Sequence, residues 1–206
     1  EVDLSGRTGL TAGTLTSTNA FIDVDSLTGS VSINSATAKT YFSANSYGAM
    51  TVGTFGVTAG YASLVSGGAM AITTGTSTGN MTIDGGTNVA LGNLTTSGGY
   101  IDALARTGGI TFGTLKANSK VKLRATSAWS NGQAISGTAM YASNGSVDLL
   151  ANSGGISMTT LSGTKQSTVT TLAGPIKIST VLGFSPTSLL TVTATGGTKT
   201  VPVAYR

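Results

Sequence analysis

The chain contains few side chains that could carry out chemistry. Histidine and cysteine are both absent, which excludes histidine acid–base catalysis, Ser-His triads, thiolate metal sites and disulfides. Carboxylates remain, because a pair of them can cleave a glycosidic bond. Seven are available: Glu1, Asp3, Asp23, Asp25, Asp84, Asp102 and Asp148.

Asp102 and Asp148 are the pair that could act together. Both occupy one outward position of a repeated strand pattern, and Lys122 occupies that position in the repeat between them. Stacked strands lie about 4.8 Å apart, so two steps place the carboxylates about 10 Å apart, beyond the inverting range and far beyond the retaining range. A lysine between two acids favours a charge ladder. We therefore predict a non-enzymatic protein without a metal or cofactor, and keep a carbohydrate-active β-helix enzyme as an alternative.

The elements that must position these side chains belong to a repeat. The segment GGITFGTL at 108–115 returns as GGISMTTL at 154–161. An apolar anchor recurs every 19 to 21 residues, and a single step of 46 holds two repeats. The anchors are Leu10, Val31, Met50, Met70, Val89, Ile110, Ile156 and Ile176, with a weak anchor near Ile135. A period of about 20 residues suits the coil of a solenoid and is too short for two helices.

A second strand in each repeat alternates inward and outward residues. Most of its inward triplets begin with a large residue, and all end with a small one, as in Val121/Leu123/Ala125. Such a taper fits a strand that runs into a tight corner. The last three predicted triplets are Val147/Leu149/Ala151, Val169/Thr171/Ala173 and Leu190/Val192/Ala194.

These patterns predict an all-β protein that forms a parallel β-helix, or β-solenoid. Residues 1–206 are expected to form a single repeat array of roughly nine to ten coils. We predict a longer corner loop at 126–146 and an irregular tail at 198–206. The repeats continue to both ends, so we expect a segment of a longer protein. The sequence has no apolar run of 18 or more residues, so it is not expected to span a membrane.

Several outward residues are candidates for contact with a partner. An outward column becomes apolar in its later half at Leu104, Leu150 and Leu172, which predicts either a partner surface or simple packing. Arg106, Lys116, Lys120, Lys122 and Arg124 form the densest basic cluster, which is either a solvated face or a site for an anionic glycan. The candidate partner or glycan contacts are Trp129, Tyr141, Lys122, Arg124, Leu104 and Leu150.

The repeat phrases GG-[ILM]-[TS]-x-[GT]-T-L and G-x-[IV]-[DK]-[AL]-x-A resemble those of filamentous-haemagglutinin-like exoproteins. These are secreted adhesins of bacterial two-partner secretion systems, and they include contact-dependent inhibition stalks. The resemblance covers roughly residues 8–196 and implies a right-handed parallel β-helix. The Asn-Pro-Asn motifs of the family's secretion domain are absent, so the resemblance implies a stalk segment.

The resemblance also implies a function. We expect a structural and adhesive rod outside the cell or on a bacterial surface, with a receptor or glycan on a host or neighbouring cell as its partner. A filament subunit that stacks end to end is the alternative. The net charge is +4 with only 11 Lys and Arg residues, too few for a phosphate-binding face, so nucleic acid is not expected as a partner.

Overall fold

The computed structural model describes residues 1–128, 132–184 and 189–201 and places them in two parallel β-sheets of ten strands each. Sheet A contains β1 (Val2–Gly6), β3 (Ile22–Ser26), β5 (Tyr41–Ser46), β7 (Tyr61–Ser66), β9 (Met81–Gly85), β11 (Tyr100–Ala105), β13 (Lys120–Ala125), β15 (Ser146–Ala151), β17 (Ser167–Thr171) and β19 (Leu190–Ala194). Sheet B contains β2 (Leu10–Ser17), β4 (Val31–Ala38), β6 (Met50–Val57), β8 (Met70–Ser77), β10 (Val89–Thr96), β12 (Ile110–Ala117), β14 (Gln133–Ala142), β16 (Gly155–Gly163), β18 (Ile176–Leu182) and β20 (Lys199–Thr200).

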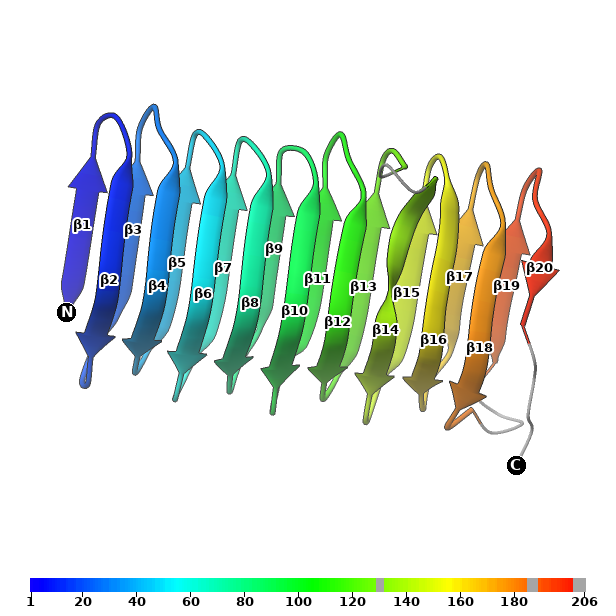
Figure 1. Ribbon diagram of the computed structural model, residues 1–206. Coiled ribbons are helices and arrows are strands. Elements are labelled where there is room, and N and C mark those ends of the chain that lie inside the picture. Colours follow the sequence, from blue (N-terminus) through cyan, green and yellow to red (C-terminus); the bar gives the residue numbers. More distant parts are fainter. Residues whose placement is uncertain (129–131, 185–188, 202–206) are drawn as a thin grey trace.

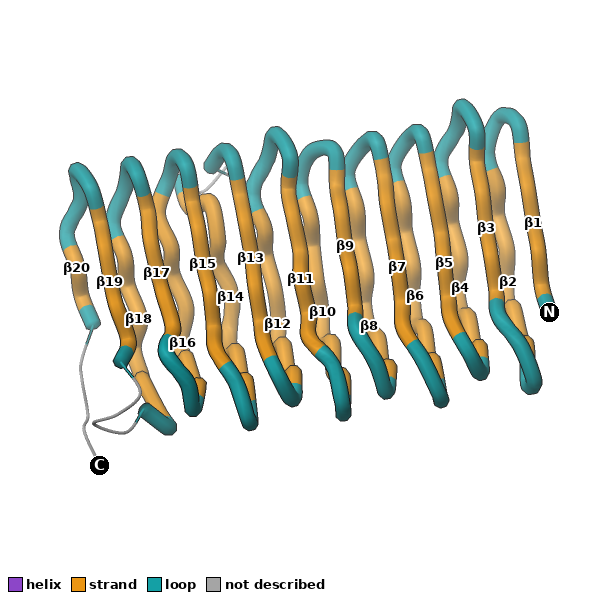
Figure 2. The backbone as a smooth tube through the Cα atoms, turned by 180° about the vertical axis from the view of Figure 1, so that it is seen from behind, coloured by secondary structure: helices purple, strands orange, loops and turns teal. Residues whose placement is uncertain are grey.

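The predicted β-solenoid is confirmed. Successive strands alternate between the two sheets, which face each other along the whole rod (Figures 1 and 2). The chain rises along sheet A, descends along sheet B and advances steadily from the N-terminus, so the winding is right-handed (Figure 1), the usual hand for parallel strand crossovers. No helix occurs in the described ranges, and hence none long and apolar enough to cross a bilayer.

Equivalent side chains stack into interior columns. In sheet B the predicted anchors pair strand by strand, and the weak anchor Ile135 pairs with both Ile110 and Ile156. In sheet A, Val121 pairs with Ile101 and Val147. Val121, Leu123 and Ala125 are buried, as the repeat predicts. Because each coil contributes only a few apolar side chains, the core exists only where neighbouring coils stack.

Each long strand of sheet B contains one position at which the bridge pairing is interrupted. In β4, Asn34 and Ser35 both face outward between the buried residues Ile33 and Ala36. The bridge pairing skips Asn34 and resumes at Ser35. The strand therefore continues across this irregularity, and the alternation resumes with Ala36 and Ala38 buried.

Buried hydroxyl groups stabilise the tight corners. Ser46 Oγ donates to the carbonyl oxygens of Gly29 and Ala49 at 2.9 and 3.1 Å. The Ser66 hydroxyl donates to the Gly68 carbonyl at 3.0 Å. A small inward residue at the end of a strand thus leaves room for the turn. Where its hydroxyl donates, as in Ser46 and Ser66, it adds a hydrogen bond to a carbonyl that already accepts a backbone amide from a neighbouring coil.

The predicted inward triplet of β17 begins two residues too late: Val169 and Thr171 face inward as predicted, but the third inward residue is Ser167 and not Ala173. Ser167, Val169 and Thr171 face inward and pair with Leu190, Val192 and Ala194. Ser167 is buried although it is polar, because its hydroxyl donates to the Lys165 carbonyl and accepts the Val147 amide, both at 2.9 Å. Leu172 therefore lies at the corner after the strand and is exposed.

The segment at 126–146, predicted to be a longer corner loop, contains strand β14, which pairs with β12 and β16. The connection from β13 to β14 spans residues 126–132, whereas the equivalent connection one coil earlier spans 106–109. The predicted irregular tail begins with β20, which pairs with β18 and adds a strand to sheet B.

Candidate binding surface on sheet A

The outer faces of the two sheets differ in charge. All six aspartates lie at outward positions of sheet A. Strand β13 adds three cations, Lys120, Lys122 and Arg124, on the same face. The outward positions of sheet B carry mainly Thr, Ser, Gly and Ala, with lysines at 116, 177 and 199. Sheet A is therefore the face on which charged groups come together.

Cations on β13 pair with both candidate catalytic carboxylates. Asp102 on β11 lies 3.7 Å from Lys122 Nζ and 3.2 Å from an Arg124 guanidinium nitrogen. On β15, Asp148 pairs with Lys120 and accepts a 2.9 Å hydrogen bond from Thr168. The predicted column of Asp102, Lys122 and Asp148 is confirmed. Alternation of charge across three strands supports a charge ladder.

The predicted basic cluster is divided between the two faces. Arg106 forms a bidentate pair with Asp84, with its Nε 2.7 Å from one carboxylate oxygen and its terminal nitrogen 2.6 Å from the other. These hydrogen bonds, and then the charge of Asp84, raise the pKa of Arg106. Lys116 lies on sheet B, where its amine sits 5.8 Å from the centre of the Tyr141 ring. Lys116 is therefore separated from the other four cations of the predicted cluster, which lie on the side of sheet A.

Four of the six predicted contact residues come together. Leu104, Arg124 and Leu150 pair in one outward column of β11, β13 and β15, and Lys122 lies beside them. Tyr141 lies on sheet B, on the opposite side of the rod. Trp129 lies outside the described residues. The next residue of the column is Thr170, not Leu172, because β17 has the shifted register.

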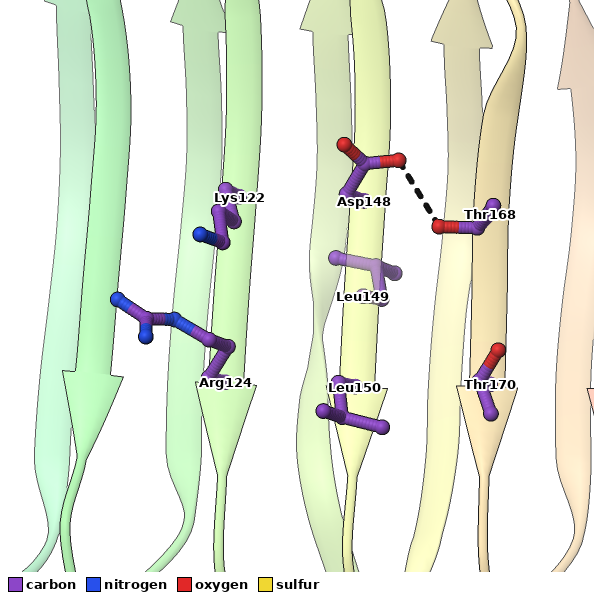
Figure 3. A pocket seen from close by; sticks show the side chains of 7 residues that line it. All are labelled: Lys122, Arg124, Asp148, Leu149, Leu150, Thr168 and Thr170. Atoms are coloured by element: carbon purple, nitrogen blue, oxygen red, sulfur yellow. Dashed lines mark hydrogen bonds between the residues drawn. The ribbon is translucent and has the colours of Figure 1, made fainter.

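Two shallow hollows open on this surface. The larger, of about 280 Å³, lies across β13, β15 and β17 and is shown in Figure 3. The smaller, of about 180 Å³, lies across β11 and β13. Lys122 lines both, so they are adjacent. The larger is lined by Lys122, Arg124, Asp148, Leu149, Leu150, Thr168 and Thr170, and the smaller by Tyr100, Ile101, Asp102, Lys120 and Lys122.

The head groups of Lys122 and Arg124 leave the larger hollow open. Both point away from β15 (Figure 3), toward Asp102 on β11. Their aliphatic stems and Leu150, which is 37% exposed, supply apolar surface. Asp148, Thr168 and Thr170 supply polar groups at the sides. The arrangement suits a ligand with both apolar and hydroxyl surfaces.

An aromatic ladder on sheet A was not predicted. Phe21 and Tyr41 stack with ring centres 4.7 Å apart, and Tyr41 and Tyr61 stack at 5.4 Å. Burial, and then the charge of Asp23, raises the pKa of Tyr41. The recurrence of an aromatic residue every 20 positions, immediately before the inward triplets, is the signal that could have identified this ladder.

Acidic residues near the N-terminus lie close together without forming a metal cage. Asp3 pairs directly with Asp23 across β1 and β3, and Asn45 donates a 2.8 Å hydrogen bond to Asp25. Within the described ranges, no three acidic, His or Cys side chains are grouped so that they could hold a metal ion.

Comparison with known proteins leaves the family open. No family profile matches the chain, and no characterised protein or solved structure matches it.

Proposed function

We propose that this chain is a non-enzymatic structural and adhesive rod, outside the cell or on a bacterial surface. The observation that carries the proposal is the unbroken pairing of ten strands in each sheet. At about 4.8 Å per coil, ten coils extend roughly 45 Å. A stack of this kind projects a module at one end and presents its sides for repeated weak contacts.

The resemblance to filamentous-haemagglutinin-like exoproteins supports the same function. It is carried by the repeat phrases and agrees with the right-handed β-helix. Fold alone does not select a function, so adhesion, secretion and surface display belong to the proposal. A receptor or glycan on a neighbouring cell is the proposed partner.

An adhesion experiment tests the proposal. Beads coated with the 206-residue chain are expected to be retained on cells under flow, and free chain in solution should compete with them. Beads coated with chain that is chemically denatured before coating serve as the unfolded control. Equal retention of both bead types, or no retention of either, rejects the adhesive role.

The same preparation separates the two alternatives. Sedimentation velocity distinguishes a single rod from a filament that grows with concentration. Cleavage of a uronic-acid polymer that is lost in Asp102→Asn and Asp148→Asn would establish an enzyme, since both substitutions leave the side-chain shape nearly unchanged.

A further inference from the structure

We propose that the two adjacent hollows on sheet A form a binding site for two neighbouring residues of an uncharged oligosaccharide. This inference rests on the proposed adhesive function and names the ligand class and the place where it binds. The hollows share Lys122 and together cross the outer face from β11 to β17. The candidate ligand therefore runs along the rod axis.

Size favours a short segment of a polymer. Ligand pockets for compact small molecules enclose about 300–1,000 Å³, whereas these hollows enclose about 280 and 180 Å³ and are open to solvent. Each is suited to one small ring lying on the surface. Because the strands repeat about every 4.8 Å, the surface advances by a step comparable with one residue of an extended sugar chain.

The lining chemistry favours a sugar. In the larger hollow, Leu150 and the stems of Lys122 and Arg124 can pack against the C–H face of a pyranose ring. Asp148 uses acceptor sites for Lys120 and Thr168, and a carboxylate has about four such sites. It can therefore accept hydrogen bonds from sugar hydroxyl groups, as can Thr170. In the smaller hollow, Tyr100 supplies an aromatic surface of the kind that packs against sugars.

Charge favours an uncharged ligand over a sulfated one. Lys120, Lys122 and Arg124 are each paired with Asp102 or Asp148. A sulfate that approached these cations would lie beside the paired carboxylates, and like-charge neighbours oppose binding. A neutral sugar can hydrogen-bond to the same groups while the ion pairs remain in place.

The test uses hexamers of β-1,4-linked glucose and of β-1,4-linked N-acetylglucosamine, with a heparin hexasaccharide as the anionic probe. Binding to the folded 206-residue chain is measured by saturation-transfer NMR and calorimetry. Leu150→Arg places a long side chain in the larger hollow, and Tyr100→Ser removes the ring from the smaller one. Val65→Arg is the matched control, because Val65 lies at the same outward position as Leu150, on β7.

We expect at least one neutral hexamer to bind, and Leu150→Arg and Tyr100→Ser each to weaken it by about tenfold or more, while Val65→Arg leaves it unchanged. Unchanged melting temperatures would show that the variants are folded. Equal affinity of Leu150→Arg and the unaltered chain, binding of heparin alone, or no binding of any probe would overturn the site. If beads coated with Leu150→Arg and beads coated with the unaltered chain are retained equally on cells, the site is rejected as the adhesive contact and the adhesive rod stands. If the hexamer binds but cells are not retained, the adhesive role fails and the site stands.

Discussion

At the scale of single residues, the corner glycines differ in what surrounds them. A Cβ added to Gly60 would lie 1.6 Å from the carbonyl oxygen of Thr40, in the preceding coil. Gly13 lies at an exposed bend, and a Cβ added there would meet no atom within 4 Å. Gly60 therefore allows two coils to approach each other, whereas Gly13 does not have that role.

This difference predicts opposite effects of the same substitution. Gly60→Ala should destabilise the fold by about 1–3 kcal/mol, because backbone atoms of two coils must move apart. Gly13→Ala should be neutral or stabilise by up to about 1 kcal/mol, because alanine restricts the unfolded chain. Urea unfolding of both variants measures the two effects. Equal destabilisation would show that coil spacing does not depend on Gly60.

Tyr41 gives a residue-scale prediction about pH. Its pKa is raised in the folded chain by burial and by the charge of Asp23, so its neutral form is favoured by folding. The resulting stabilisation is complete below the unfolded pKa of about 10 and is lost as pH rises through the folded value. Melting temperatures between about pH 8 and 11 should therefore fall less steeply in Tyr41→Phe than in the unaltered chain. Tyr47→Phe, which removes an exposed phenol at a corner, is the control and should keep the original slope.

At the scale of strands, large and small residues in neighbouring coils complement each other. A Cβ on Gly75 of β8 would lie 2.3 Å from the ring of Phe55 on β6, its partner in the ladder. A Cβ on Gly137 of β14 would meet the ring of Phe112 on β12 at 2.4 Å. Each bulky ring thus occupies space that the next coil leaves free, which keeps the interior closely packed.

A double-mutant cycle tests this complementarity. Gly75→Ala should cost about 1–3 kcal/mol because its methyl group overlaps the Phe55 ring. Phe55→Leu alone should also destabilise, since it leaves a gap beside Gly75. The double variant should be more stable than the sum of the two effects predicts, by about 0.5–3 kcal/mol. Simple additivity in chemical denaturation would contradict direct packing between the two positions.

The residues of a strand that face the core could be predicted wherever the inward positions carry apolar side chains. In sheet A, the inward residues of β3 to β15 were predicted correctly, because these positions carry apolar residues such as Val147 and Leu149. In β17 the first inward position is Ser167, and its burial depends on two hydrogen bonds that only stacked coils provide. The site was predictable in part for a related reason. The 20-residue period placed Leu104, Arg124 and Leu150 in one column. It could not place Lys116 or Tyr141 relative to that column, because these two residues belong to the other strand of each coil.

At the scale of the whole molecule, each coil contacts only its neighbours. The ladders join β13 to β11 and β15 within sheet A, and Leu123 is completely buried between Ala103 and Leu149. Leu4 in β1 is only half-buried and has one ladder partner, Val24. The stability of such a rod is close to a sum over coils and the interfaces between them. A destabilising substitution should therefore disturb the coils next to it and leave distant coils folded.

Substitutions in the middle and at the end of the rod test whether such a disturbance stays local. Leu123→Asp buries a charge without a partner and should cost about 3 kcal/mol or more, whereas Leu4→Asp can turn its charge toward solvent and should cost less. Hydrogen exchange should show lost amide protection in β11–β16 for Leu123→Asp, with protection retained in β3–β7. Leu4→Asp should affect only the first strands, β1–β3. A uniform loss of protection along the rod in either variant would mean that the coils unfold as a single unit. In that case stability could not be assigned to interfaces between neighbouring coils, even though the folded chain is built by stacking them.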